Sequence, residues 1–228
     1  MAEVASRRTD RERAIAVIVL AKAPIPGAAK TRLVPRLGAH GAARLHAALV
    51  ERTLETVRRA GLGRIELCCS PDATHPFFAA CARRYGVALT VQSPGDLGAR
   101  MLAALDRVVA VAGRALLVGT DCPALAPAHL QEAAAALAAG HDAVLGPAED
   151  GGYVLVGLAR AAPEVFAGIR WGGREVLRDT RARLAGLGWR WHELGELWDI
   201  DRPADLARFA GRIAGGADDI AAALRVRT

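Results

Sequence analysis

Apolar runs of strand length alternate with amphipathic runs of helix length along most of this chain, and that alternation limits the fold more than any other feature. The first run, residues 14–21, is continuously apolar and rich in β-branched side chains, as in a strand buried on both faces. Four such strand–helix pairs precede residue 141. Repeated alternation of this kind predicts right-handed crossovers and a mostly parallel sheet covered by helices on both faces.

The individual elements follow from the same patterns. The rhythm changes at 141–158, where two short runs flank an Asp-Gly-Gly turn, which predicts a local antiparallel hairpin. We interpret residues 14–228 as a single α/β domain, a three-layer α/β/α sandwich, preceded by a charged flexible tail at 1–13. The expected strands are 14–21, 64–70, 87–92, 114–121 and 189–194, and the expected helices are 39–60, 75–86, 97–113, 126–140, 172–188 and 203–226.

Composition and charge exclude several classes of protein. The longest apolar run, 14–21, is too short to span a bilayer, and the polar start lacks the apolar segment of a signal peptide. We therefore expect a cytoplasmic protein with no membrane partner. The net charge of +6 permits nucleic-acid binding, but the arginines alternate with acidic residues on helical faces, so no nucleic-acid partner is expected. The four cysteines show no CxxC spacing, which argues against structural zinc.

Both lysines of the chain lie in one stretch, KAPIPGAAKTRL at residues 22–33, directly after the first expected strand. A glycine-containing loop with free N–H groups and lysine, placed at the end of a strand, is typical of phosphate binding. The stretch is neither a Walker A loop nor a GxGxxG fingerprint, and a proline-stiffened surface loop with solvated lysines is the alternative. The expected phosphate-binding residues are Lys22, Pro26, Gly27, Lys30, Thr31 and Arg32.

Aspartates follow two later runs. Asp121 ends the fourth expected strand and precedes a Cys-Pro turn, so its carboxylate is expected at the ligand-binding edge of the sheet. Magnesium needs few protein ligands there, because substrate oxygens and water supply the rest. Asp199 and Asp201 would share one face of an extended segment and are the second metal candidates. The alternative for Asp201 is that it caps the helix that begins at Pro203.

Two glycine-containing segments complete the candidate site. Asp150 is the candidate base or acceptor contact, although Asp-Gly is also an ordinary hairpin signal. The segment 93–101 could admit a nucleobase or ribose through its glycines, although Asp96 could equally be an ordinary N-cap. The expected nucleotide-side residues are Asp96, Gly98 and Arg100, and the expected substrate-side residues are Gly151, Gly152 and Tyr153.

Six motifs in order, KAPIPGAAKTRL, GDLGARM, GTDCPAL, GPAEDGGYVLVGL, FAGIRW and WDIDRPADL, resemble the DUF2064 family over about residues 14–210. These are glycosyltransferase-like members of the GT-A, nucleotide-diphospho-sugar transferase superfamily. The resemblance implies a Rossmann-like GT-A sheet, a nucleotide donor and Mg²⁺ or Mn²⁺. It extends more distantly to 2-phospho-lactate guanylyltransferase and molybdenum-cofactor guanylyltransferases, in which a basic loop after the first strand holds a triphosphate. By that analogy Asp121 and Asp201 would hold the metal.

The chain departs from the family pattern at three places. Trp171-Gly172-Gly173 replaces the usual Trp-Ser-Thr, Arg202 replaces a threonine, and the Asp-x-Asp of many glycosyltransferases is absent at 119–121. Three functions stay open: a metal-dependent glycosyltransferase with a nucleotide-sugar donor, a nucleotidyltransferase that moves a nucleotide from a nucleoside triphosphate to a phosphorylated acceptor, and a nucleotide-binding protein without turnover. The expected partners are the nucleotide and a small-molecule acceptor, and a homodimer is compatible with this interpretation.

Overall fold

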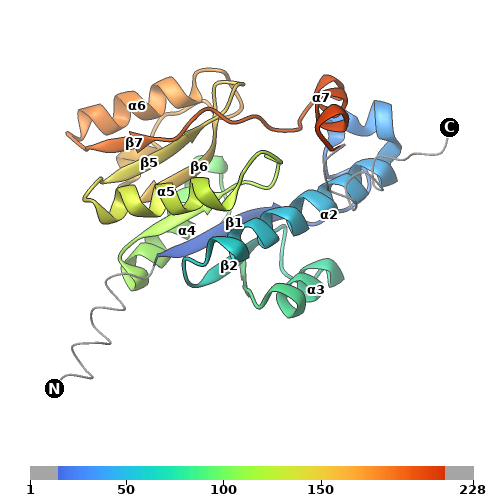
Figure 1. Ribbon diagram of the computed structural model, residues 1–228, viewed down its shortest axis with the longest axis horizontal. Coiled ribbons are helices and arrows are strands. Elements are labelled where there is room, and N and C mark those ends of the chain that lie inside the picture. The colour runs from blue at the N-terminus through green and yellow to red at the C-terminus, as the bar shows by residue number, and fades with distance from the viewer. Residues whose placement is uncertain (1–14, 214–228) are drawn as a thin grey trace.

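A computed structural model describes residues 15–213 of the 228. The expected tail at 1–13 and the expected helix beyond residue 213 lie outside this range. The strands form one sheet of seven in the order β3-β2-β1-β4-β6-β5-β7 (Figure 1). They are β1 (Ala16–Lys22), β2 (Ile65–Ser70), β3 (Ala88–Val91), β4 (Ala115–Val118), β5 (Ala143–Pro147), β6 (Tyr153–Leu158) and β7 (Trp191–Glu193).

Strand β6 runs against the rest of the sheet. It pairs antiparallel with both β4 and β5, whereas every other pairing between these strands is parallel. The β5–β6 pair is the expected hairpin around Asp-Gly-Gly, and β6 inserts between β4 and β5 because the turn is too short for a crossover helix. The predicted α/β class, with a mostly parallel sheet and a local antiparallel pair, is confirmed.

Helices cover both faces of the sheet. One core cluster joins the sheet to α2 (Val34–Ala60), α3 (Pro76–Tyr85) and α5 (Pro127–Ala138), and a second joins the opposite face to α4 (Leu97–Ala112) and α6 (Val176–Gly186). Fully buried Ile18 and Leu116 lie on opposite faces, which explains why these strands read as continuous apolar runs rather than alternating ones. The three-layer sandwich follows directly.

A third apolar cluster fixes the C-terminal segment. Trp198 and Ile200 pack with Phe209 of α7 (Pro203–Ile213) against the first half of α2. Figure 1 shows α7 beside the first turns of α2, at the end of the molecule to which β1 points. This cluster brings the chain near residue 200 back over the loop that follows β1, although more than 160 residues separate the two in sequence.

Two helix starts differ from the sequence expectation. The helix expected from 39 begins at Val34, but Gly38 has φ 69° and ψ 165° and interrupts it, so the regular part starts near the expected residue. The helix expected from 172 begins at Val176 instead, because Gly172 has φ +81°, a left-handed conformation that an α-helix does not allow. The residues 172–175 form a turn that leads into α6.

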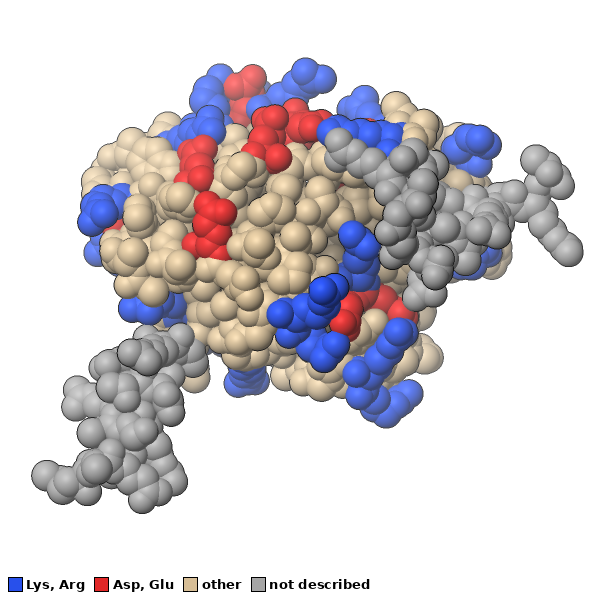
Figure 2. Space-filling model, in the orientation of Figure 1, with Lys and Arg blue, Asp and Glu red and all other residues tan. Residues whose placement is uncertain are grey.

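The surface of the described region carries scattered charge. On the face shown in Figure 2, basic side chains lie in separate groups, several of them beside acidic ones, and form no continuous band. No helix among residues 15–213 has the length and apolar character needed to cross a bilayer.

Candidate functional site

A cavity of about 610 Å³ opens at the carboxyl ends of β1, β3 and β4. Parallel strands place their following loops at this one edge, which is where ligands bind in open α/β sheets. The loop after β1 contributes one wall, the start of α4 and Gln92 another, and the loop after β4 a third. Of the residues expected from the sequence, the cavity is lined by Lys22, Lys30, Thr31, Arg32, Arg100, Asp121, Tyr153 and Asp201.

Lys30 and Asp121 meet within this cavity. The Lys30 side chain is only 4% exposed, and its Nζ lies 2.8 Å from Oδ1 of Asp121 and donates a hydrogen bond to the carbonyl of Ile200. Lys30 adopts a left-handed backbone conformation with φ 49°, which is uncommon for a residue other than glycine. The basic loop and the carboxylate at the tip of β4 therefore face one another, as the sequence predicted.

A second ion pair lies at the rim. Arg32 pairs with Oδ2 of Asp201, and the Ile200 N–H donates to the Asp121 carbonyl at 2.8 Å, which ties the C-terminal segment to the loop after β4. The alternative in which Asp201 caps α7 is wrong. Asp205 does so instead, since its Oδ2 accepts hydrogen bonds from the backbone N–H groups of Asp201 and Arg202 at 3.0 and 2.7 Å.

The loop after β1 also presents backbone donors. Its internal bonds, such as Ala28 N–H to the Ile25 carbonyl at 3.0 Å, hold the first half of the loop in a turn, and Gly27 adopts φ +81° there. The N–H groups of Lys30, Thr31 and Arg32 donate to none of the described residues. Consecutive free N–H groups beside a lysine are suited to phosphate oxygens.

Asp199 stands near Asp121 without an ion-pair partner of its own among the described residues. Burial, together with the negative charges of Asp150 and Asp121, raises the pKa of Asp199 to about 6. A carboxyl group whose pKa is raised by other carboxylates marks a place where negative charge is concentrated. Such a place attracts a cation.

The donor set of this corner fits a divalent cation that a substrate helps to hold. Oδ1 of Asp121 is buried, and the Lys30 ammonium lies 2.8 Å from it without forming a well-aligned hydrogen bond. Carboxylate oxygens are the ligands that Mg²⁺ and Mn²⁺ prefer. Among residues 15–213, however, no three His, Cys, Asp or Glu side chains come close enough to form a metal centre by themselves. Phosphate oxygens would have to complete the coordination.

The Asp150 turn is shaped by its glycines. Oδ1 of Asp150 accepts a hydrogen bond from the Gly152 N–H at 2.9 Å, and the Asp150 side chain is exposed. A Cβ at Gly151, which has φ +88°, would lie 2.1 Å from the carbonyl oxygen of Arg174. Gly151 therefore lets the turn pack against the chain that leads into α6, a structural role in addition to the substrate-side role expected for it.

We expect Gly151→Ala to lower the free energy of unfolding by about 3 kcal/mol, because both a strained backbone and an overlap with backbone must be relieved. Gly172→Ala is the matched control: Gly172 has a similar φ of +81° but open space around its Cβ position. The control should cost only about 1 kcal/mol, from backbone strain alone. Urea unfolding of the two variants measures the difference, and equal losses would contradict the close packing at Gly151.

The start of α4 also differs in part from the sequence interpretation. Asp96 is the N-cap of α4, with Oδ1 accepting from the Ala99 N–H at 2.8 Å, so the capping alternative is confirmed. Gly98 does not open space for a base, because a Cβ there would lie 2.6 Å from the Trp171 ring, which fills that space. Arg100 lines the cavity and donates to the Gly95 carbonyl at 2.9 Å.

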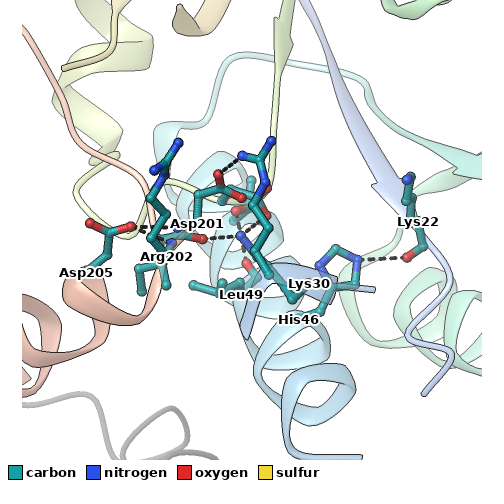
Figure 3. A network of polar contacts seen from close by, with 11 residues as sticks. Lys22, Lys30, His46, Leu49, Asp201, Arg202 and Asp205 are labelled. Atoms are coloured by element: carbon teal, nitrogen blue, oxygen red, sulfur yellow. Dashed lines mark hydrogen bonds and ion pairs between the residues drawn. The ribbon is translucent and has the colours of Figure 1, made fainter. Parts of the chain in front are cut away.

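Sequence reasoning missed two residues of the cavity. His46 of α2 is 5% exposed, and its Nε2 lies 3.0 Å from the Lys22 carbonyl (Figure 3). A carbonyl only accepts, so Nε2 carries the proton and Nδ1, which is buried and has no hydrogen-bond partner among the described residues, is an acceptor. Gln92 donates from Nε2 to the carbonyls of Ala21 and Cys68 at 3.3 and 3.0 Å. Gln92 could have been identified from the sequence, because it is a polar residue directly after the end of β3.

The buried His46 makes stability depend on pH. Burial lowers the pKa of His46 below its ordinary value of 6.5, and the Asp121 charge opposes this only in part. The unfolded chain therefore binds the His46 proton more readily than the folded chain does. The contribution of neutral His46 to the free energy of unfolding is fully present above pH 6.5 and is lost as the pH falls below that value. We expect the free energy of unfolding to fall more between pH 7 and pH 5 in the wild type than in His46→Gln; parallel curves would contradict this.

The four cysteines have no catalytic environment. Burial raises the pKa of Cys122 to about 11, and all four thiols are buried and unpaired, which fits packing rather than catalysis. The expected residues that do not line the cavity are Pro26, Gly27, Asp96, Gly98, Asp150, Gly151, Gly152 and Asp199.

Many solved structures resemble this chain. A candidate nucleotide-diphospho-sugar transferase from Desulfovibrio desulfuricans G20 matches with a TM-score of 0.82 and 29% identity, covering 92% of this chain and 93% of that one. Rv0371c from Mycobacterium tuberculosis H37Rv in complex with manganese matches with a TM-score of 0.51 and 21% identity, covering 87% and 99%. The 4-diphosphocytidyl-2C-methyl-D-erythritol synthase of Anaerococcus prevotii DSM 20548 matches with a TM-score of 0.60 and 12% identity, covering 89% and 97%.

The last two likenesses are below 25% identity and show a shared fold only. The Desulfovibrio neighbour is named as a candidate transferase of nucleotide-diphospho-sugars, in agreement with the transferase expected from the sequence. No curated protein matches the chain. The family model of DUF2064, an uncharacterized protein conserved in bacteria, matches residues 53–173, more than half of the 228 residues, and the chain belongs to this family.

Proposed function

We propose that this protein is a metal-dependent transferase that acts on a nucleotide sugar, holding the donor's diphosphate between the loop after β1 and the tip of β4. The observation that carries the proposal is the meeting of Lys30 with Asp121 in one cavity, 2.8 Å apart, at the carboxyl ends of parallel strands. The Desulfovibrio neighbour, named as a candidate nucleotide-diphospho-sugar transferase, supports the same class of donor.

Each part of the cavity has a role in this proposal. The N–H groups of residues 30–32, with Lys22 and Arg32, bind the phosphate oxygens and stabilise the charge that develops on the departing diphosphate. Asp121, with Asp199 and Asp201 nearby, would hold the Mg²⁺ or Mn²⁺, and the manganese complex of the Mycobacterium neighbour supports that choice of ion. When bound, this ion supplies Lewis-acid stabilisation of the leaving diphosphate.

The acceptor side is built around the Asp150 turn. Asp150 is exposed and stands outside the cavity lining, and its negative charge contributes to the raised pKa of Asp199; it is the candidate base for an acceptor hydroxyl. Tyr153 follows the turn and lines the cavity. The Gly172-Gly173 segment follows Trp171, whose ring contacts Tyr153 at 6.5 Å between centroids, and it provides no hydroxyl for the acceptor.

Nucleotidyl transfer is the second candidate. It is favoured by the free N–H groups of the loop after β1, which could hold the β- and γ-phosphates of a nucleoside triphosphate. The fold likeness to the 4-diphosphocytidyl-2C-methyl-D-erythritol synthase of Anaerococcus prevotii supports this candidate. The acceptor phosphate would then attack the α-phosphorus, and pyrophosphate would leave.

One experiment separates the candidates. The protein is incubated with a panel of nucleotide sugars and a panel of nucleoside triphosphates, with and without Mg²⁺ or Mn²⁺, and the released phosphate species is identified. A nucleoside diphosphate released from a nucleotide sugar supports glycosyl transfer, and pyrophosphate released from a triphosphate supports nucleotidyl transfer. A rise in Tm that is independent of metal, with no product, would favour a non-catalytic nucleotide-binding protein and end both proposals.

A further inference from the structure

The Lys30 ammonium is placed where a divalent cation would otherwise compensate Asp121. Its Nζ lies 2.8 Å from Oδ1 of Asp121, and the side chain is 4% exposed, whereas the Asp121 side chain is 46% exposed. The contact is electrostatic rather than a directed hydrogen bond, since Oδ1 accepts no well-aligned bond from any described residue. The directed bond of the ammonium goes to the Ile200 carbonyl instead. Charge, not geometry, therefore holds Lys30 on this oxygen.

An ammonium and a divalent cation would compete for the same oxygen. A metal ligated by Oδ1 would lie about 2 Å from it, so two positive charges would stand within a few ångströms of each other in a mostly buried corner. Repulsion between two cations at that separation disfavours binding of both to the same oxygen. Asp199 and Asp150 add negative charge nearby, but Lys30 offsets part of it, as its effect on the pKa of Asp199 shows.

Phosphate offers the ammonium another partner. Lys30 belongs to the same turn as the free N–H groups of Thr31 and Arg32, so a diphosphate bound to those groups would lie close to the Lys30 side chain. A phosphate oxygen that attracts Nζ would release Oδ1 of Asp121 and at the same time supply further oxygens for a metal. The absence of a preformed metal centre among the described residues agrees with this order.

We propose that Lys30 is an internal counter-ion that keeps divalent metal off Asp121 until a diphosphate draws its ammonium away. The proposal rests on the proposed function for the identity of the diphosphate, but the ion pair itself does not. Without a diphosphate, the protein would bind divalent metal weakly. Binding of the donor would then promote binding of the metal. The coupling is reciprocal, so metal also tightens binding of the diphosphate.

The first test measures Mn²⁺ binding by electron paramagnetic resonance, with no nucleotide present. Lys30→Met removes the ammonium and keeps the length and apolar character of a side chain that is buried. Lys22→Met is the matched control, because it removes an equal charge from the same cavity at a lysine that forms no ion pair among the described residues. We expect Lys30→Met to bind Mn²⁺ at least about tenfold more tightly than the wild type, and Lys22→Met to change the affinity much less.

Two outcomes of this titration overturn the proposal. Unchanged or weaker Mn²⁺ binding by Lys30→Met would mean that metal and Lys30 do not share Asp121, for example because metal uses only the exposed Oδ2. Equal gains in Lys30→Met and Lys22→Met would mean that the net charge of the cavity, not the Lys30 contact, controls metal affinity. Neither result depends on whether the protein uses a nucleotide.

The second test uses the wild type and therefore does not depend on a variant that folds. The chain has only two lysines, so ¹⁵N-lysine labelling gives ammonium signals from Lys22 and Lys30 alone. Inorganic pyrophosphate is the probe. We expect the Lys30 signal to shift with pyrophosphate but not with Mg²⁺ alone; a shift with Mg²⁺ alone, or none with saturating pyrophosphate, overturns the proposal. If pyrophosphate does not bind, the proposed function fails, while the Mn²⁺ comparison still decides the competition.

Discussion

Asp121→Asn is expected to lower kcat/KM for the nucleotide substrate about a thousandfold while leaving the fold intact. Asparagine keeps one oxygen at nearly the same place but loses the charge that would hold a divalent cation, and loss of one electrostatic stabiliser of the leaving group has effects of about this size. The half-exposed pair with Lys30 should contribute at most about 1 kcal/mol to stability, because solvent screens it.

The measurement compares steady-state turnover over a range of Mg²⁺ concentrations, with urea unfolding of the same samples. Asp106→Asn, on the exposed surface of α4, is the control and should change neither. A variant at position 121 that keeps wild-type turnover at low Mg²⁺ would remove this carboxylate from the site. Lost turnover together with lost folding would instead assign Asp121 a structural role.

The sequence predicted the location of the site because one rule of topology links strand ends to ligand binding. Lys22 ends β1 and Asp121 follows β4, and these strands are parallel neighbours, so their following loops had to meet at one edge. Gln92 could have been found by the same rule, since it follows β3. Only the common direction of the parallel strands was needed, and not the detail of any side chain.

Contacts between residues distant in sequence were beyond prediction. Trp171 fills the space at Gly98, and Arg32 pairs with Asp201; each depends on how two segments pack, which spacing does not encode. His46 sits on an apolar helix face beside Leu45 and Leu49, where a histidine is normally a core residue. Its orphan Nδ1 becomes visible only once the loop after β1 is placed above it.

The negative charges around Asp199 lower the stability of the folded protein. Its pKa rises from 3.8 to about 6 because burial, Asp150 and Asp121 all disfavour the ionised form. The folded protein then binds this proton more tightly than the unfolded chain does. Stability is therefore lost as the pH rises from about 4 through 6, and the full cost is present above pH 6. A rise of this size corresponds to about 3 kcal/mol, as an upper value.

Asp199→Asn should accordingly stabilise the protein by about 1–3 kcal/mol at pH 7.5 and change its stability little at pH 4, where the wild-type carboxyl is already neutral. Urea unfolding at the two pH values, with Asp106→Asn as the control, measures the effect. The same substitution should weaken metal-dependent turnover, since it removes a charge that attracts the cation. A substitution that raises stability and lowers activity indicates that the native residue serves function at the expense of stability. If Asp199→Asn destabilises the protein at pH 7.5, the carboxylates near Asp121 do not repel one another, and the electrostatic basis for a cation in this corner disappears.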